Sequence, residues 1–212
     1  MRLPGSKVYR QVRGHEKPGF GFWRPDHALS AAEVERAVTG VRRLGGPMAA
    51  WNRCQGLAEV AQGVQDRDDR ARLLQEAFAN ADDCQEPNRV VTVGAWPLRA
   101  LLDTGELEWF ERELDRLLRV ILAEPNPFRR QDGLYALLFV DAPQLSFDRT
   151  LDLFCAACRE AQKTQTMRRV AEYVSRAHHA KAVEVCQLIR EPRRRRQALR
   201  AIGLVFGSPQ SS

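Results

Sequence analysis

An arginine recurs at regular intervals along the chain, each time near the start of an apolar stretch. Successive copies are separated by 36, 41 and 39 residues, and the arginines are Arg53, Arg89, Arg130 and Arg169. An apolar residue stands four positions after each of them: Leu57, Val93, Leu134 and Tyr173. A period near 40 residues with helical patterning inside it is typical of stacked helix pairs, in which each pair buries its apolar face against the next.

Helical spacing of apolar residues fills the segments between these arginines. It is clearest over residues 106–122, where one face carries Leu107, Phe110, Leu114, Leu117, Leu118 and Ile121. The other face offers the i,i+4 pairs Glu108–Arg112 and Asp115–Arg119. Strand signals are nearly absent. We therefore predict an all-α fold of about nine or ten helices, stacked as antiparallel helix pairs in a right-handed, α-solenoid-like array; a compact irregular bundle is the alternative.

Turn residues and caps set the expected helix limits. Ser30 and Glu33 form a capping box, Asp66 or Asp68, Asn88 and Ser146 are expected caps, and Pro97 should kink or divide its helix. The expected helices cover about 30–44, 48–64, a segment after residue 66, 89–102, 106–122, 127–140, a segment after residue 146, 167–177, 180–190 and 192–206. The interval from Arg169 to Arg195 is only 26 residues, so either the last pair has short helices or residues 168–190 form one helix.

The chain divides into an irregular N-terminal arm over 1–28, a helical domain over 29–206 and a tail over 207–212 that is expected to be disordered. The arm holds Phe20, Phe22 and Trp23, so residues 17–23 are expected to pack against the first helices. The composition, 44% hydrophobic and 28% charged, is that of a globular protein. No run approaches the roughly 18 apolar residues that span a bilayer, and no secretory leader is visible, so no membrane association and a cytoplasmic location are expected.

The segment Pro192–Gly203, Pro-Arg-Arg-Arg-Arg-Gln-Ala-Leu-Arg-Ala-Ile-Gly, resembles the part of HEAT and tetratricopeptide repeats in which Pro and Arg precede a helix of small and aliphatic residues. Residues 128–138 are a looser copy. The resemblance covers roughly residues 48–206. It implies a scaffold fold and does not by itself imply chemistry.

Charge is distributed unevenly. Residues 1–28 have a balance of +4, residues 29–164 of −5, and residues 165–212 of +7. The C-terminal third could therefore bind an anionic partner. The candidate anion- or partner-binding residues there are Arg168, Arg169, Arg193, Arg194, Arg195, Arg196 and Arg200.

The only grouping of metal-ligand types is Cys155 and Cys158 with His178 and His179, which could hold zinc. The simpler interpretation is two core cysteines on an amphipathic helix and two histidines in a turn; the five cysteines are expected to be free thiols. The acidic residues of 106–115 are expected to form a solvated, ion-paired helix face rather than a catalytic pair. We expect no catalytic residue, no metal and no cofactor.

The predicted function is a non-catalytic scaffold that binds a protein or peptide along one groove of the array. Nucleic-acid or other polyanion binding through the basic C-terminal third is the alternative. The repeated arginines Arg53, Arg89 and Arg130 are expected to be structural, donating to carbonyls that end the preceding helix or pairing with a neighbouring unit. A ligand-facing ladder of arginines is the other interpretation.

Overall fold

The computed structural model describes residues 28–206, and this part of the chain is all-α, without strands. The predicted fold class is confirmed. The expected packing of residues 17–23 and the expected disorder of 207–212 lie outside the described residues. Within residues 28–206, ten helices follow one another: α2 (Ala31–Arg42), α3 (Ala49–Gly63), α4 (Arg67–Asp82), α5 (Pro87–Asp103), α6 (Leu107–Leu122), α7 (Pro127–Leu138), α8 (Gln144–Glu160), α9 (Thr164–Val174), α10 (His179–Gln187) and α11 (Pro192–Phe206).

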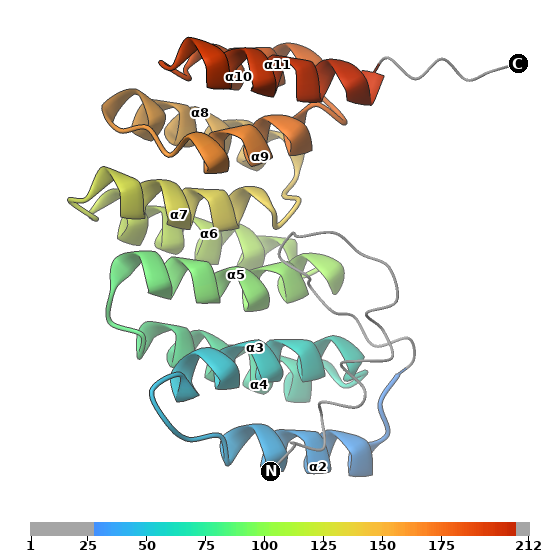
Figure 1. Cartoon of the computed structure of the whole chain (residues 1–212). Helices are drawn as coiled ribbons and strands as arrows, with labels where there is room; N and C mark the ends of the chain where they lie inside the picture. Colours follow the sequence, from blue (N-terminus) through green and yellow to red (C-terminus); the bar gives the residue numbers. More distant parts are fainter. Residues whose placement is uncertain (1–27, 207–212) are drawn as a thin grey trace, which may run out of the picture.

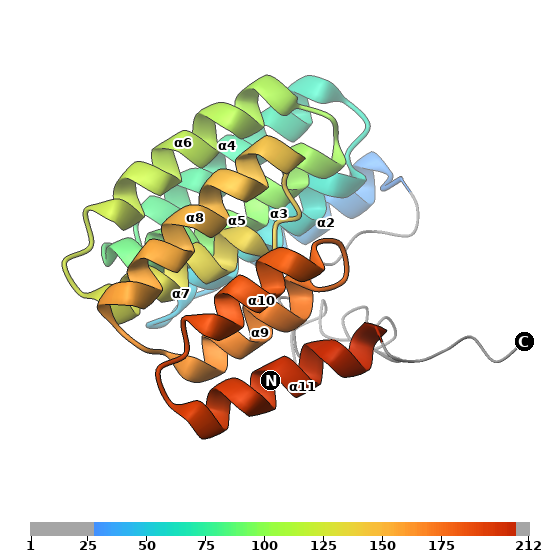
Figure 2. The same cartoon turned by 90° about the horizontal axis from the view of Figure 1, so that it is seen from above.

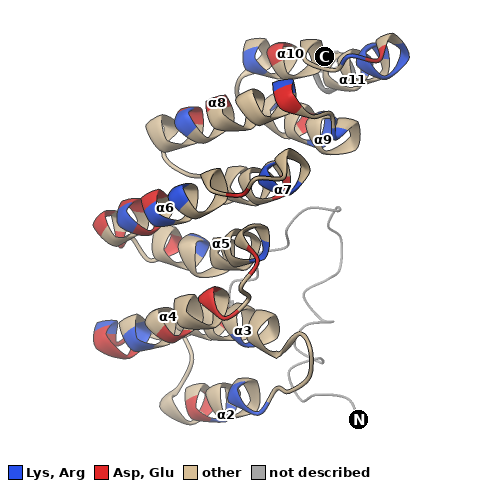
Figure 3. Ribbon diagram, turned by 90° about the vertical axis from the view of Figure 1, so that its left-hand side faces the viewer, with Lys and Arg blue, Asp and Glu red and all other residues tan. Residues whose placement is uncertain are grey.

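The helices form two rows (Figure 1). We call α3, α5, α7, α9 and α11 the A helices and α2, α4, α6, α8 and α10 the B helices. The A helices α3, α5, α7 and α9 each pack on the B helix that follows, which gives the units α3–α4, α5–α6, α7–α8 and α9–α10. The rows are seen edge-on in Figure 3, and the view from above in Figure 2 places α11 at the outer edge of the last unit.

The two rows differ in how successive units meet. Each A helix packs directly on the next one, from α3 to α5, α7, α9 and α11, whereas the B helices of neighbouring units touch only sparsely. The repeated apolar positions Leu57, Val93 and Leu134 are all fully buried. The core is therefore continuous along the A row, and each B helix covers it from one side.

A glycine allows close approach at one of these junctions. A Cβ built on Gly133 of α7 would lie 2.4 Å from Cδ1 and 2.6 Å from Cγ1 of Ile121, a fully buried side chain of α6. Both distances are far below van der Waals contact, so a side chain at position 133 would displace the buried Ile121 side chain or move the two helices apart. The absence of a side chain at this position sets the spacing between the second and third units.

Several predicted helix limits are confirmed and others are wrong. The Ser30–Glu33 capping box is present, and Asp66 caps α4 by accepting a hydrogen bond from the Asp69 amide. Asn88 and Ser146 are not caps: α5 begins one residue before Asn88, and Ser146 lies inside α8. In α5 a proline, Pro87, occupies the first helical position, where its fixed φ suits the helix, and in α8 Pro143 is the cap residue that precedes Gln144.

Two further expectations are settled by the helix limits. Pro97 does not divide its helix, since α5 is continuous through it. Pro97 has no amide hydrogen to donate to the Val93 carbonyl, and this carbonyl instead accepts a hydrogen bond from the Cys54 thiol of α3 at 3.5 Å. The short interval after Arg169 reflects a last pair of short helices, of 11 and 9 residues, rather than one long helix.

Candidate binding surfaces

Polar side chains bridge neighbouring B helices where apolar contact is sparse. Four ion pairs join successive B helices: Arg42–Glu76 at 2.6 Å, Asp82–Arg116 at 2.8 Å, Asp115–Arg149 at 2.7 Å, and Asp148–Lys181. The partners are 33 or 34 residues apart in the sequence. We call this set the B-row ladder, and Figure 3 shows charged residues along α4, α6 and α8.

The ladder corrects the expected ion pairing of α6. Asp115 pairs across the row with Arg149 of α8, and Arg112 approaches Glu113 at 3.9 Å. Glu111 accepts a hydrogen bond from the Ser146 hydroxyl of α8 at 2.5 Å. Glu111 and Asp115 thus join α6 to α8, a role that pairing rules within a single helix do not reveal.

A shallow hollow opens between α4 and α6, because these two B helices stand apart. It consists of two adjoining depressions of about 370 and 460 Å³ that share Trp109 and Arg112. Phe78 of α4 and Trp109 of α6 form its apolar floor, with ring centroids 6.3 Å apart. We call this feature the α4–α6 hollow. Its lining is Arg67, Gln75, Phe78, Ala79, Asp82, Gly105, Glu106, Leu107, Glu108, Trp109, Arg112, Glu113 and Arg116.

Two guanidinium groups lie over the rings of the hollow. The Arg116 guanidinium is 5.6 Å from the Phe78 ring centroid, and that of Arg112 is 6.0 Å from Trp109. Arg116 is also held by Glu113 at 2.6 Å and by Asp82 at 2.8 Å. The Arg112 side chain is 69% exposed and has only the long contact with Glu113. Cation–π contacts orient both groups without using up their hydrogen-bond donors.

Arg67 and Arg116, the other basic residues around the hollow, are paired with carboxylates. Arg67 donates two hydrogen bonds to Glu106, at 3.0 and 2.8 Å, and these hold the pKa of the Glu106 carboxyl below its usual value. Leu107 is an apolar neighbour with 52% of its surface exposed. The hollow therefore combines two rings and an exposed leucine with one lightly engaged arginine.

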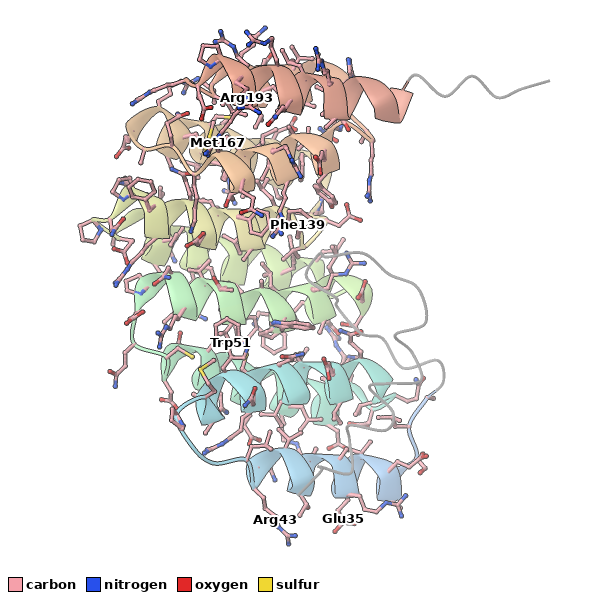
Figure 4. The ribbon with its side chains drawn as sticks, in the orientation of Figure 1. Glu35, Arg43, Trp51, Phe139, Met167 and Arg193 are labelled. Carbon is pink, nitrogen blue, oxygen red and sulfur yellow. The ribbon has the colours of Figure 1, made fainter. Side chains whose placement is uncertain are left out.

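An aromatic stack lies on the opposite, A-row side of the molecule. The rings of Tyr135 and Phe139 on or beside α7 are 4.7 Å apart, and Phe139 stacks on Tyr173 of α9 at 4.4 Å; Figure 4 labels Phe139 at the junction of these helices. The Tyr173 hydroxyl donates to Asp141 at 3.1 Å, and burial raises the pKa of Tyr173 to about 12. Asp141 has a positive φ of 63°. The stack holds the turn after α7, so its aromatics have a structural role.

The four residues considered for zinc do not come together. Cys155 and Cys158 lie in the last turns of α8, whereas His178 contacts Gln144 at the first turn of the same helix. Eleven helical residues separate positions 144 and 155, or about 16 Å along the axis. Within residues 28–206 no three His, Cys, Asp or Glu side chains are grouped so that they could hold a metal ion. Burial raises the pKa of Cys155 to about 11 and that of Cys158 further still, so both remain protonated thiols.

The repeated arginines occupy three kinds of environment. Arg53 donates to the Leu44 carbonyl at 3.0 Å, and Arg130, 19% exposed, pairs with Glu160 of α8 at 2.9 Å. Arg89 is 52% exposed and pairs only with Glu86, three residues earlier. Arg169 is exposed on α9. The period marks equivalent places in the array, but the bonding of the arginines differs from unit to unit.

The basic C-terminal residues lie on α9 and α11, which pack together. Arg168 pairs with Glu172 and Arg194 with Glu191, at 3.0 and 2.7 Å. Arg195 is half-buried. Four others are exposed, with no acidic group of the described chain in ion-pair contact: Arg169, Arg193, Arg196 and Arg200.

No protein-family model, no curated protein and no solved structure matches this chain. None of the helices within residues 28–206 is long and apolar enough to cross a membrane. Function therefore has to be argued from the surfaces described above. Sequence reasoning missed the α4–α6 hollow, whose residues come from two helices; the only signal was the 34-residue spacing of opposite charges.

Proposed function

We propose that this chain is a non-catalytic helical-repeat scaffold, related to HEAT-like and tetratricopeptide-like arrays, that binds a short segment of a partner protein across the α4–α6 hollow. The observation that carries the proposal is the part-exposed ring of Trp109, which lies in the hollow beside the exposed guanidinium of Arg112 and above the buried ring of Phe78. Tryptophan and arginine are the residue types most enriched where protein interfaces concentrate their binding energy.

The hollow favours a segment with an apolar side chain next to an acidic one. The rings and Leu107 would cover the apolar side chain, and a carboxylate would replace the 3.9 Å contact of Arg112 with a closer, charge-assisted hydrogen bond. Arg67 and Arg116 already have carboxylate partners. Arg112 is thus the group on which charge recognition depends.

The cell compartment we propose is the cytoplasm. All five cysteines lie in the described part of the chain, and all are free thiols, three of them buried. A protein kept in a reducing compartment has this pattern of cysteine use. Partners would accordingly be cytoplasmic proteins.

The test is selection from a random peptide library on the full chain, followed by affinity measurement on the enriched peptides. The diagnostic variant is Trp109→Ala with Arg112→Ala. The matched control, Leu145→Ala with Arg119→Ala, removes an apolar residue and an arginine that are exposed on B helices outside the hollow.

The expected result is enrichment of peptides with an acidic residue beside an apolar one. Their affinity should fall at least tenfold in the diagnostic variant and stay within twofold in the control. Circular dichroism confirms that both variants are folded. Peptides that bind the diagnostic variant as tightly as the wild type would refute the proposed site.

A further inference from the structure

Helix α11 forms one end of the array, and its charge is unlike that of the other helices. Every other described helix carries both acidic and basic residues, whereas Pro192–Phe206 contains five arginines and no acidic residue. Figure 4 shows nitrogen-tipped side chains gathered along this end, around Arg193.

The arginines of α11 are sorted by face. Ala198 and Ile202 are buried against the array, and the half-buried Arg195 lies on the same side. Arg193, Arg196 and Arg200 follow the spacing i, i+3, i+7, which places them together on the opposite, outward face of the helix. We call these three residues the α11 stripe.

The other end of the array shows that a terminal helix does not require this charge. Terminal repeats need a polar outer face for solubility. In α2 that need is met by residues of both signs: Glu33, Glu35, Arg36 and Arg42. Solubility alone therefore does not account for a stripe of one sign.

The position of the arginines also has a cost within the isolated chain. Four of them occupy positions 193–196, in the first turn of α11. The helix dipole disfavours cations at this end, and Glu191 neutralises only Arg194. A bound anion would relieve the repulsion among the remaining arginines and would meet the helix dipole favourably.

We infer that the α11 stripe binds the phosphate backbone of a nucleic acid without reading its sequence, a function separate from the proposed peptide hollow. Seven residues of helix place the three guanidinium groups within about 10 Å, and this length matches about three phosphates of one strand. Arginine suits the task because its planar fork binds phosphate through two parallel hydrogen bonds.

The test is fluorescence anisotropy of labelled 20-nucleotide single strands and 20-base-pair duplexes of mixed sequence, with the full chain, from 50 to 200 mM salt. The diagnostic variant carries Arg193→Gln, Arg196→Gln and Arg200→Gln. The control carries Arg36→Gln, Arg43→Gln and Arg119→Gln, which removes three exposed arginines elsewhere and gives the same net charge.

Three neutralised phosphates give a slope of log affinity against log salt of about −2 for the single strand and about −3 for the duplex. The diagnostic variant should bind at least tenfold more weakly at 50 mM salt, with a slope near zero, while the control stays within threefold of the wild type. The Trp109→Ala, Arg112→Ala variant should bind as the wild type does, so failure of one proposal is distinguishable from failure of the other.

An equal loss of nucleic-acid affinity in the two triple variants would show that binding depends only on net charge, and it would overturn the inference. So would the absence of nucleic-acid binding at 50 mM salt, or binding confined to phosphatidylserine vesicles in a parallel sedimentation assay. Circular dichroism of each variant excludes loss of fold as the cause.

Discussion

The two rows of helices solve the same problem, joining one unit to the next, by different means. A helices meet through buried apolar side chains, whereas B helices are bridged by ion pairs such as Asp115–Arg149. Burial of apolar surface stabilises far more than exposed ion pairs do. The A row therefore supplies most of the stability, and the B row can leave space, such as the α4–α6 hollow, for a partner.

The largest effect should come from filling the close approach between Gly133 of the A helix α7 and Ile121 of α6. Gly133→Leu forces Ile121 and α7 apart and should lower the free energy of unfolding by about 3 kcal/mol, because an overpacked core has no room to relax. Gly40→Leu is the matched control, since nothing lies within 4 Å of a Cβ at this helical glycine. Urea unfolding should show the control to be at least as stable as the wild type; a comparable loss in both would contradict the packing argument.

The next effect separates the repeated arginines. Arg130→Ala removes a largely buried arginine stem from the junction within the α7–α8 unit, so it should cost about 1–2 kcal/mol, mostly through lost packing, because Glu160 is 52% exposed and is hydrated by water. The sequence predicts the same structural role for Arg89 as for Arg130. Because Arg89 is 52% exposed and pairs only with Glu86 on the same helix turn, Arg89→Ala should lower the free energy of unfolding by less than about 0.5 kcal/mol. Thermal melts that shift equally for the two variants would contradict this distinction.

A smaller effect should appear in the B-row ladder. A double-mutant cycle with Asp115→Asn and Arg149→Gln should give a coupling of about 0.2–1 kcal/mol in low salt, because both side chains are about half exposed. The coupling should disappear in 1 M NaCl, where charges are screened within about 3 Å. A coupling that survives high salt would mean that the pair is more buried than its exposure indicates.

The smallest effect is a dependence of stability on acid. Hydrogen bonds from Arg42 and Lys181 hold the pKa values of Glu76 and Asp148 below their ordinary values of 4.5 and 3.8. A carboxyl whose pKa is lower in the folded state adds stability above its ordinary pKa and loses it as pH falls through the lowered value. Melting temperature should thus be flat from pH 7 to about 5 and decline below about 4.5. In Glu76→Gln with Asp148→Asn the decline should be shallower.

The A row was largely predictable from the sequence, and the B row was not. Leu57 and Leu134 are fully buried where the repeat places them, because a buried position depends mainly on helical period and apolar character. The partner of Asp115 depends instead on the distance between two helices. The sequence pattern predicts an ion pair with Arg119 on the same helix, whereas in the structure Asp115 pairs with Arg149 of the next B helix, α8.

The candidate sites divide in the same way. The exposed arginines of α11 follow from the local helix pattern, so the sequence already singled them out. The α4–α6 hollow requires Phe78 and Trp109, 31 residues apart, to face each other across two helices that stand apart. Whether the two rings face each other depends on the distance between neighbouring helix pairs. Close approaches such as the one at Gly133 influence that distance, and no local sequence pattern encodes it.

Native-state hydrogen exchange tests the central claim, that the A row holds the array together, most directly. Amides in the middle of α5 and α7 have packed neighbours on both sides along the row, whereas those of α6 and α8 lie on helices open to solvent on one face. Local opening requires less free energy where fewer apolar contacts are lost. The account predicts that amides exchange most slowly in α5 and α7 and faster in α6 and α8. In high salt the exchange rate should rise further, and only in the B helices. Exchange in α6 and α8 as slow as in α5 and α7, and unaffected by salt, would contradict it.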